Sequence, residues 1–261
     1  MKPENAQRLA DVLVAAPREV RQLAALDPDL VPATHAEAYA VNALVADGLG
    51  WPPLGWKIAA TTPVMQQRLR TDVPIYGRTY RRFEHASPAS FRHADLLDPI
   101  LECEFFFRLG SGLPPRTHPY NSEEVADAVA SVHAGVEIAE CRFPLDVLPP
   151  VPAVLADGAA SGRYIVGTEI VGWRERDLAT MPVVLDINGR TRRTGSGAEV
   201  MGDPIAPLVW LANARSVWGD GLAAGTLVST GTATGMLLAR PGDRAVALFD
   251  GKPAVEIVFD A

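Results

Sequence analysis

The segment 101–107 constrains the fold more than any other part of the chain. It reads Leu-Glu-Cys-Glu-Phe-Phe-Phe, and a short apolar run with three aromatic residues, bounded by a proline and a glycine, predicts a strand. Because side chains alternate between the two faces of a strand, Glu102 and Glu104 lie on one face and Cys103 lies on the other. The strand therefore carries two neighbouring carboxylates, which repel each other and lose hydration if they are buried.

Two interpretations of this carboxylate pair are open from these residues alone. In the first, Glu102 and Glu104 form an acidic edge that faces water. In the second, they bind a hard divalent cation, because carboxylate oxygens suit Mg²⁺ or Mn²⁺. Other parts of the chain have to decide between the two.

The first fifty residues are predicted to be helical. Apolar residues recur at intervals of three and four over 5–27, where Pro17 predicts an interruption into two short helices. A further helix is expected at about 34–47, with Thr34 as its N-cap and glycines at its end. We expect residues 1–50 to form an N-terminal helical cap on the rest of the chain.

Residues 51–261 are predicted to be rich in strands. Strands are expected at 55–60, 101–107, 135–143, 164–171, 183–188, 226–230, 245–249 and 254–259. Helices are expected at 63–69, 122–133 and 204–217, with loops at 74–77, 80–98, 144–152 and 192–197. Helices at the front and strands behind indicate an α+β protein with a mixed sheet, in which both regions form one integrated domain.

Composition argues against several classes of protein. The net charge is −7 and the basic residues are scattered, so a nucleic-acid partner is not expected. No apolar stretch reaches 18 residues, so no membrane-spanning helix is expected. Only two cysteines occur and the N-terminus lacks the apolar core of a signal peptide, so a cytoplasmic location is expected.

Two further features are ambiguous by themselves. Lys57 lies in the expected strand 55–60, where a lone lysine most often reaches along an apolar surface into water. The small-residue loop 156–162 permits close approach of the backbone to a ligand, but it also suits a simple turn.

Six separated segments, in the same order along the chain, resemble the 2-keto-4-pentenoate hydratase branch of the fumarylacetoacetate hydrolase superfamily. Each segment is weak alone, but six in order are strong, and the resemblance covers nearly the whole chain from about residue 45. The segments are Gly-Trp-Lys57-Ile, Leu-Glu102-Cys-Glu104-Phe, Gly-Val-Glu137-Ile, Ala-Asp157-Gly-Ala-Ala-Ser161, Gly195-Ser-Gly-Ala-Glu199-Val-Met-Gly202-Asp-Pro204 and Ser-Thr230-Gly231-Thr-Ala-Thr-Gly-Met.

The resemblance implies a fold and a metal site. The fold is a mixed β-roll or sandwich of the fumarylacetoacetate hydrolase C-terminal type, over residues 51–261, with the helical region before it. Glu102, Glu104 and Glu137 are implied to bind one Mg²⁺ or Mn²⁺. Three carboxylates leave open positions on an octahedral ion, which can then polarise a 2-oxo acid as a Lewis acid.

The resemblance also implies roles for four residues around the metal. Lys57 is implied to be catalytic, because a lysine there can pair with the substrate carboxylate or move a proton. Ser161, Thr230 and Gly231 match positions that bind the substrate, a small 2-oxo acid. Members of the family often assemble, so a homo-oligomer is expected.

The chain departs from the family pattern at one chemically important position. Related hydratases carry an aspartate in a Pro-Asp-Phe-Gly loop, and this chain has Pro-Ile75-Tyr-Gly. Asp72 matches another acidic position of the motif, and Gly158 stands where an asparagine is common. These changes leave the metal site intact and bear on the hydration step.

The leading hypothesis is a lyase that hydrates a 2-hydroxy-2,4-dienoate to a 4-hydroxy-2-oxo acid in aromatic catabolism. The alternatives in the same superfamily are a metal-dependent 2-oxo-3-enedioate decarboxylase and a diketo-acid hydrolase that would use Glu84 and His85 to activate water. A non-catalytic small-acid-binding or partner subunit is a further alternative. The arginines of segment 78–82 suggest either a dicarboxylate substrate or a solvated basic loop.

Overall fold

The computed structural model describes residues 1–260, apart from the side chain of Arg18. Its α-helices are α1 (Pro3–Glu19), α2 (His35–Leu49), α3 (Pro63–Leu69), α4 (Ser122–Ala128), α5 (Val151–Ala156) and α6 (Ile205–Trp218). Its first strands are β1 (Pro53–Ala59), β2 (Ile75–Tyr80), β3 (Glu84–Ala86), β4 (Ala89–Arg92), β5 (Ile100–Leu109) and β6 (Val129–Ala139). The others are β7 (Arg163–Glu169), β8 (Pro182–Ile187), β9 (Arg190–Ser196), β10 (Leu227–Ser229), β11 (Leu237–Leu238), β12 (Arg244–Phe249) and β13 (Lys252–Asp260).

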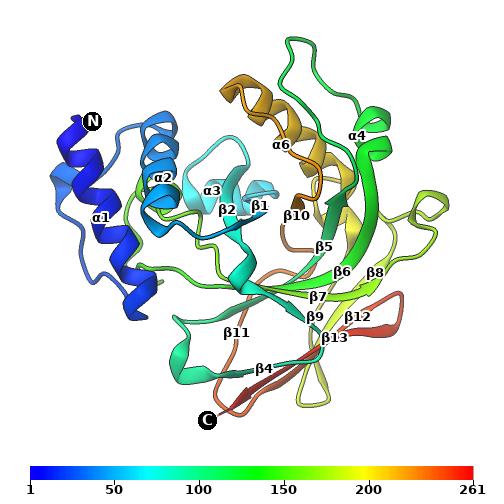
Figure 1. Ribbon diagram of the computed structural model, residues 1–261. Helices are drawn as coiled ribbons and strands as arrows, with labels where there is room; N and C mark the ends of the chain where they lie inside the picture. Colours follow the sequence, from blue (N-terminus) through cyan, green and yellow to red (C-terminus); the bar gives the residue numbers. More distant parts are fainter. Residues whose placement is uncertain (261) are drawn as a thin grey trace.

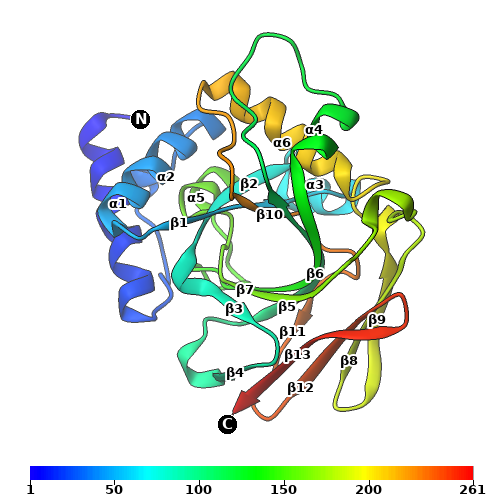
Figure 2. The ribbon, with the colours of Figure 1, turned by 45° about the vertical axis from the view of Figure 1, so that its right-hand side comes forward.

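Two curved sheets form the centre of the molecule (Figures 1 and 2). The larger has the order β2-β1-β10-β5-β6-β7-β3, with β11 also paired to β5, and the smaller has the order β4-β13-β12-β8-β9. Both mix parallel and antiparallel pairs, since β1–β10, β3–β7 and β13–β4 are parallel and the other pairs are antiparallel. The predicted α+β fold with a mixed sheet is therefore confirmed.

The N-terminal helices lie together beside the larger sheet (Figure 1). The prediction for α2 is confirmed, because the Thr34 hydroxyl accepts from the Glu37 amide at 3.2 Å and Gly50 ends the helix with φ 61°. The prediction of two short helices before it is wrong. Pro17 lies in the last turn of the single helix α1, which ends two residues later at Glu19, so the proline accompanies the end of one helix and does not separate two helices. The division of the chain at residue 50 stays a prediction.

Several predicted boundaries shift because pairing between strands overrides local pattern. Residues 74–77 are not a tight loop, since β2 begins at Ile75 and pairs with β1, and most of segment 192–197 belongs to β9. The helix expected to reach residue 133 ends at Ala128, where β6 begins its long pairing with β5. The helix begins at Ser122, the first residue of the predicted range, and Asn121 is its N-cap.

Strand β5 is anchored by its apolar face. Cys103, Phe105 and Phe107 are fully buried, and the Phe105 ring meets Phe249 of the smaller sheet edge-on at 5.4 Å. Full burial of a large apolar side chain contributes roughly 1.5–3 kcal/mol, so these contacts fix which face of β5 is turned to the core. The two glutamates of β5 consequently point away from the core between the sheets.

Strand register brings the polar residues onto the same face of the larger sheet. Glu102 of β5 lies opposite Glu137 of β6, and Glu137 lies opposite Tyr164 of β7. Lys57 of β1 lies opposite Ser229 of β10. Directly opposite residues project from the same face of a sheet, so five strands contribute to one site. Among residues 1–260, no helix is both long and apolar enough to cross a membrane.

A close backbone approach holds the loop after α5 against β2. Gly77 lies opposite Lys57, and a Cβ built on Gly77 would be 1.9 Å from the carbonyl oxygen of Gly158.

We expect Gly77→Ala to reduce the free energy of unfolding by about 3 kcal/mol, because backbone atoms would have to move. The control is Gly189→Ala, where a Cβ meets nothing within 4 Å and the positive φ alone costs about 1 kcal/mol. Urea unfolding measures both; equal losses would contradict the prediction.

Candidate functional site

Three glutamates from two neighbouring strands form a carboxylate cluster. Glu102 and Glu104 come from β5 and Glu137 from β6, and one oxygen of each lies within 4.8 Å of the others. Glu104 and Glu137 are buried, and Glu102 is half-buried. Within residues 1–260, no other group of three acidic, histidine or cysteine side chains is placed to hold a metal ion.

The pKa values of all three carboxylates are raised above their usual range. Burial raises the pKa of Glu102 to about 7, with a further contribution from the charge of Glu137. Burial also raises the pKa of Glu104 well above its usual range, and the charges of the two other carboxylates add to this effect. The pKa of Glu137 is raised by burial, although Lys57 opposes the shift. Like charges held close together in a dry site favour proton or cation uptake.

Hydrogen bonds orient two of the three carboxylates. The Ser229 hydroxyl and the Gly231 amide, the latter at 3.1 Å, donate to Oε2 of Glu104. The Tyr164 hydroxyl donates to Oε1 of Glu137 at 3.1 Å. The second oxygen of Glu137 is buried and has no hydrogen-bond partner. Because a buried, unpaired carboxylate oxygen is costly, this atom is suited to bind a ligand that lies within the cluster.

The cluster fits a hard divalent cation. All of its donors are carboxylate oxygens, which is the ligand type that Mg²⁺ and Mn²⁺ prefer. A bound cation would pair with the free oxygen of Glu137 and would offset the burial and mutual repulsion that raise the pKa values of the three carboxylates. The acidic-edge interpretation does not describe the cluster, since Glu104 is 1 % exposed and Glu137 is not exposed at all.

Lys57 is buried beside the cluster. Its Nζ donates to the carbonyl oxygen of Ala159 at 2.9 Å and lies 3.2 Å from Oε1 of Glu137. Burial by itself would lower its pKa, but the charges of the three glutamates outweigh burial and raise it. With only 2 % of its surface exposed, the interpretation of Lys57 as a lysine that reaches into water is wrong.

The loop that contacts Lys57 is held in a strained conformation by a buried ion pair. Arg142 donates through Nε to Oδ1 of Asp157 at 2.7 Å and through one terminal nitrogen to the Ser161 carbonyl at 2.8 Å. Ala159 and Ala160 have φ values of 57° and 58°, a region that alanine rarely adopts. Sequence reasoning missed Arg142, whose only signal was a charged residue at the end of a predicted buried strand.

Gly231 lines the cavity beside the cluster, whereas Ser161 and Thr230 do not. The Ser161 hydroxyl is 2.9 Å from the Tyr164 hydroxyl, which in turn donates to Glu137. The Thr230 hydroxyl accepts from the backbone amide of Phe105 at 3.3 Å. These contacts orient the carboxylate strands, and substrate binding by Ser161 and Thr230 stays a prediction.

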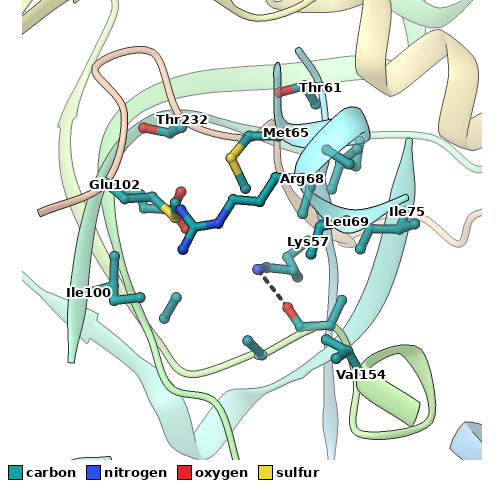
Figure 3. Close-up of a pocket in the computed structure, with 18 of the residues that line it drawn as sticks. Lys57, Thr61, Met65, Arg68, Leu69, Ile75, Ile100, Glu102, Val154 and Thr232 are labelled. Atoms are coloured by element: carbon teal, nitrogen blue, oxygen red, sulfur yellow. Dashed lines mark hydrogen bonds between the residues drawn. The ribbon is translucent and has the colours of Figure 1, made fainter. Parts of the chain in front are cut away.

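A cavity of about 140 Å³ opens over the cluster. Figure 3 shows Lys57 and Glu102 on its wall, with Met65, Arg68 and Leu69 of α3 beside them. Most of the remaining wall is apolar and consists of Ile58, Ile75, Ile100, Leu145, Leu148, Val154 and Met236. The cavity therefore combines a charged floor with walls that suit a hydrocarbon chain.

The proposed water-activating pair is not in this cavity. Glu84 pairs with Arg108 at 2.7 Å, and the His85 ring meets Phe91 edge-on at 4.9 Å. Neither Glu84 nor His85 lines the cavity, and none of the arginines of segment 78–82 does so. The structure thus gives no support to a hydrolytic dyad at these residues or to a dicarboxylate site at these arginines.

Residues 92–258 match the model of the fumarylacetoacetate (FAA) hydrolase C-terminal family. The chain is 30 % identical to a 2-keto-4-pentenoate hydratase of Paraburkholderia xenovorans (strain LB400), with 100 % of this chain and 97 % of the relative covered. It is 27 % identical to a 4-oxalocrotonate decarboxylase of Pseudomonas putida, with 98 % and 97 % covered.

The structure is also similar to a solved decarboxylase. The 4-oxalocrotonate decarboxylase of Pseudomonas putida G7, complexed with magnesium and adipate, superposes with a TM-score of 0.91. Its sequence is 27 % identical, and the match covers 99 % of this chain and 98 % of that one. Relatives with two different activities are thus similar over nearly the full length.

The raised pKa of Glu102 predicts a pH-dependent affinity for Mg²⁺. Its carboxyl is protonated below about pH 7 when no cation is bound, and a cation binds only the ionised form. Each proton that the cation displaces weakens binding about tenfold for every pH unit below the pKa of its carboxyl, so displacement from Glu102 alone sets a lower limit on the effect. We expect calorimetric titration of the metal-free protein to show weaker Mg²⁺ binding at pH 6 than at pH 8, with proton release.

Glu102→Gln tests the same cluster by substitution. The amide cannot supply a carboxylate ligand, so Mg²⁺ affinity is expected to fall at least about tenfold. The control is Glu123→Gln, which removes an exposed glutamate of α4 and is expected to bind Mg²⁺ as the unchanged protein does. Unchanged Mg²⁺ affinity in Glu102→Gln would show that Glu102 is not a metal ligand.

Proposed function

Because the chain belongs to the fumarylacetoacetate hydrolase C-terminal family, we propose that it is a hydro-lyase that acts on a 2-hydroxy-2,4-dienoate. It adds water to give a 4-hydroxy-2-oxo acid, a step in the catabolism of aromatic compounds. The observation that carries the proposal is the cluster of Glu102, Glu104 and Glu137, with an unpaired oxygen and a buried lysine at the floor of a cavity.

The three glutamates hold one divalent cation, Mg²⁺ or Mn²⁺. When bound, the cation supplies Lewis-acid polarisation of the 2-oxo acid. The protein contributes a fixed set of ligands. The Ser229 hydroxyl and the Gly231 amide orient Glu104, and the Tyr164 hydroxyl orients Glu137. Ligands held in place before binding lower the cost of ordering them around the ion.

Lys57 is the residue that moves a proton. Its ammonium group lies beside the cluster and is kept protonated by the carboxylates around it. From this position it can pair with the substrate carboxylate and exchange a proton with the carbon chain during ketonisation. The Ala159 carbonyl fixes the direction of the lysine side chain, so the strained loop takes part in positioning the proton donor.

A second candidate function is decarboxylation of a 2-oxo-3-enedioate. It is favoured by Ile75, which is 2 % exposed and lines the cavity where related hydratases carry an aspartate. Loss of CO₂ from such a substrate needs stabilisation of the resulting enolate and no acid to activate water. The similarity to the magnesium- and adipate-bound decarboxylase supports this candidate as well.

An ultraviolet assay in the presence of Mg²⁺ separates the two reactions. We expect loss of the dienoate absorbance with 2-hydroxypenta-2,4-dienoate, and formation of a product heavier by one water in mass spectrometry. Release of CO₂ from a 2-oxo-3-enedioate, with no hydration of the dienoate, would support the second candidate instead. Metal-dependent binding of both acids without turnover would contradict an enzymatic function.

Lys57→Met tests the proton-transfer role. The substitution keeps the aliphatic stem and removes the ammonium group, and removal of a general acid–base residue lowers turnover by roughly 10²–10⁴-fold. Mg²⁺ affinity should be retained, because Lys57 is not a ligand in this proposal. Lys252→Met, at an exposed lysine of β13, is the matched control. Turnover by Lys57→Met within a few fold of the control would rule out the role.

A further inference from the structure

Arg68 is the one cavity-lining cation that has no role in the site described above. Among the described residues that line the cavity, only Lys57 and Arg68 carry a positive charge. Figure 3 shows the Arg68 side chain extending from α3 into the cavity. The Lys57 side chain is paired with Ala159 and Glu137, whereas the side chain of Arg68 forms no hydrogen bond, ion pair or ring contact within residues 1–260.

The face of α3 that carries Arg68 is turned to the cavity by the helix itself. Met65, Arg68 and Leu69 are separated by three and four positions, so they lie on one face, and all three line the cavity. The Thr62 hydroxyl caps α3 by accepting from the backbone amide of Met65 at 3.3 Å, and the side-chain amide of Gln66 donates to the Ala60 carbonyl at 2.9 Å. These contacts fix the orientation of the helix.

The two ends of the cavity differ in burial. At the floor, Glu104 is 1 % and Lys57 is 2 % exposed, whereas Arg68 is exposed to solvent. Apolar side chains, among them Leu69 and Ile75, form the wall that would surround the carbon chain of a 2-oxo acid whose head group lies at the floor. Arg68 is the lining cation at the solvent-exposed end of the cavity, which is where the far end of such a molecule would lie.

We propose that Arg68 determines specificity by binding a second carboxylate at the end of the substrate remote from its 2-oxo acid. The preferred substrates are then unsaturated 2-oxo dicarboxylates, which bind more tightly than monocarboxylates such as 2-hydroxypenta-2,4-dienoate. A guanidinium group binds a carboxylate through charge-assisted and often paired hydrogen bonds. This inference rests on the proposed function for the position of the 2-oxo acid, and it holds for hydration and for decarboxylation alike.

Two inert acids of equal length test the inference. 2-Oxoadipate and 2-oxohexanoate share the 2-oxo acid and six carbons, and they differ only in a terminal carboxylate. By calorimetry with the full-length Mg²⁺-loaded protein, we expect 2-oxoadipate to bind on the order of tenfold more tightly. Arg68→Gln should abolish that preference and leave the affinity for 2-oxohexanoate unchanged, and Arg68→Lys should restore part of it.

The control variant comes from the same helix end. Arg70 is exposed at the C-cap of α3 and does not line the cavity, so Arg70→Gln should keep the preference for the diacid. Equal affinity of the unchanged protein for the two acids would overturn the inference. So would a loss in Arg68→Gln that is equal for both acids, because Arg68 would then contact the 2-oxo acid end.

Failure of the proposed function has a different signature. If binding of both acids is unaffected by removal of Mg²⁺ and by Glu102→Gln, the 2-oxo acid does not lie at the carboxylate cluster. A diacid preference that is lost in Arg68→Gln would then still support Arg68 as the carboxylate-binding residue. Absence of binding by either acid would count against both proposals.

Discussion

Burial of like charges is the constraint on which the rest of the structure depends. Three carboxylates on adjacent strands repel each other in a site largely closed to water, and burial raises their pKa values. Hydrogen-bond donors from separate elements offset this repulsion. Ser229 and Gly231 donate to Glu104, and Tyr164 and Lys57 lie against Glu137. Compensation is incomplete without a cation, because one oxygen of Glu137 has no partner.

The part of this site that is local in sequence could be predicted from sequence. Alternation along 101–107 places Glu102 and Glu104 on one face, because the period of a strand needs only neighbouring residues. Glu137 has no comparable local signal, since the register of β6 against β5 brings it opposite Glu102. It was identified only through resemblance to a family. The environment of Lys57 was misjudged because its partner Ala159 is 102 residues away.

The same distinction explains the errors in the fold. Capping of α2 by Thr34 depends on adjacent residues and was predicted correctly. The start of β2 at Ile75 depends on pairing with β1, so a proline–glycine pattern was misleading there. Arg142 is the clearest case that local sequence does not predict. A buried arginine is stable there only because it pairs with Asp157 and donates to the Ser161 carbonyl of the loop. Contacts between distant segments decide what a local pattern leaves open.

The arrangement separates the chemistry of the head group from the choice of substrate and reaction. Sheet strands fix the carboxylates and Lys57, whereas the wall above them comes partly from α3 and the start of β2. A hydratase and a decarboxylase match the chain over nearly the same length at similar identity, so overall similarity does not distinguish their activities. The distinction has to arise from a few wall residues. Ile75 and Arg68 both belong to that wall. The Ile75 side chain has no proton to transfer, whereas the Arg68 side chain carries a positive charge that is not paired within residues 1–260.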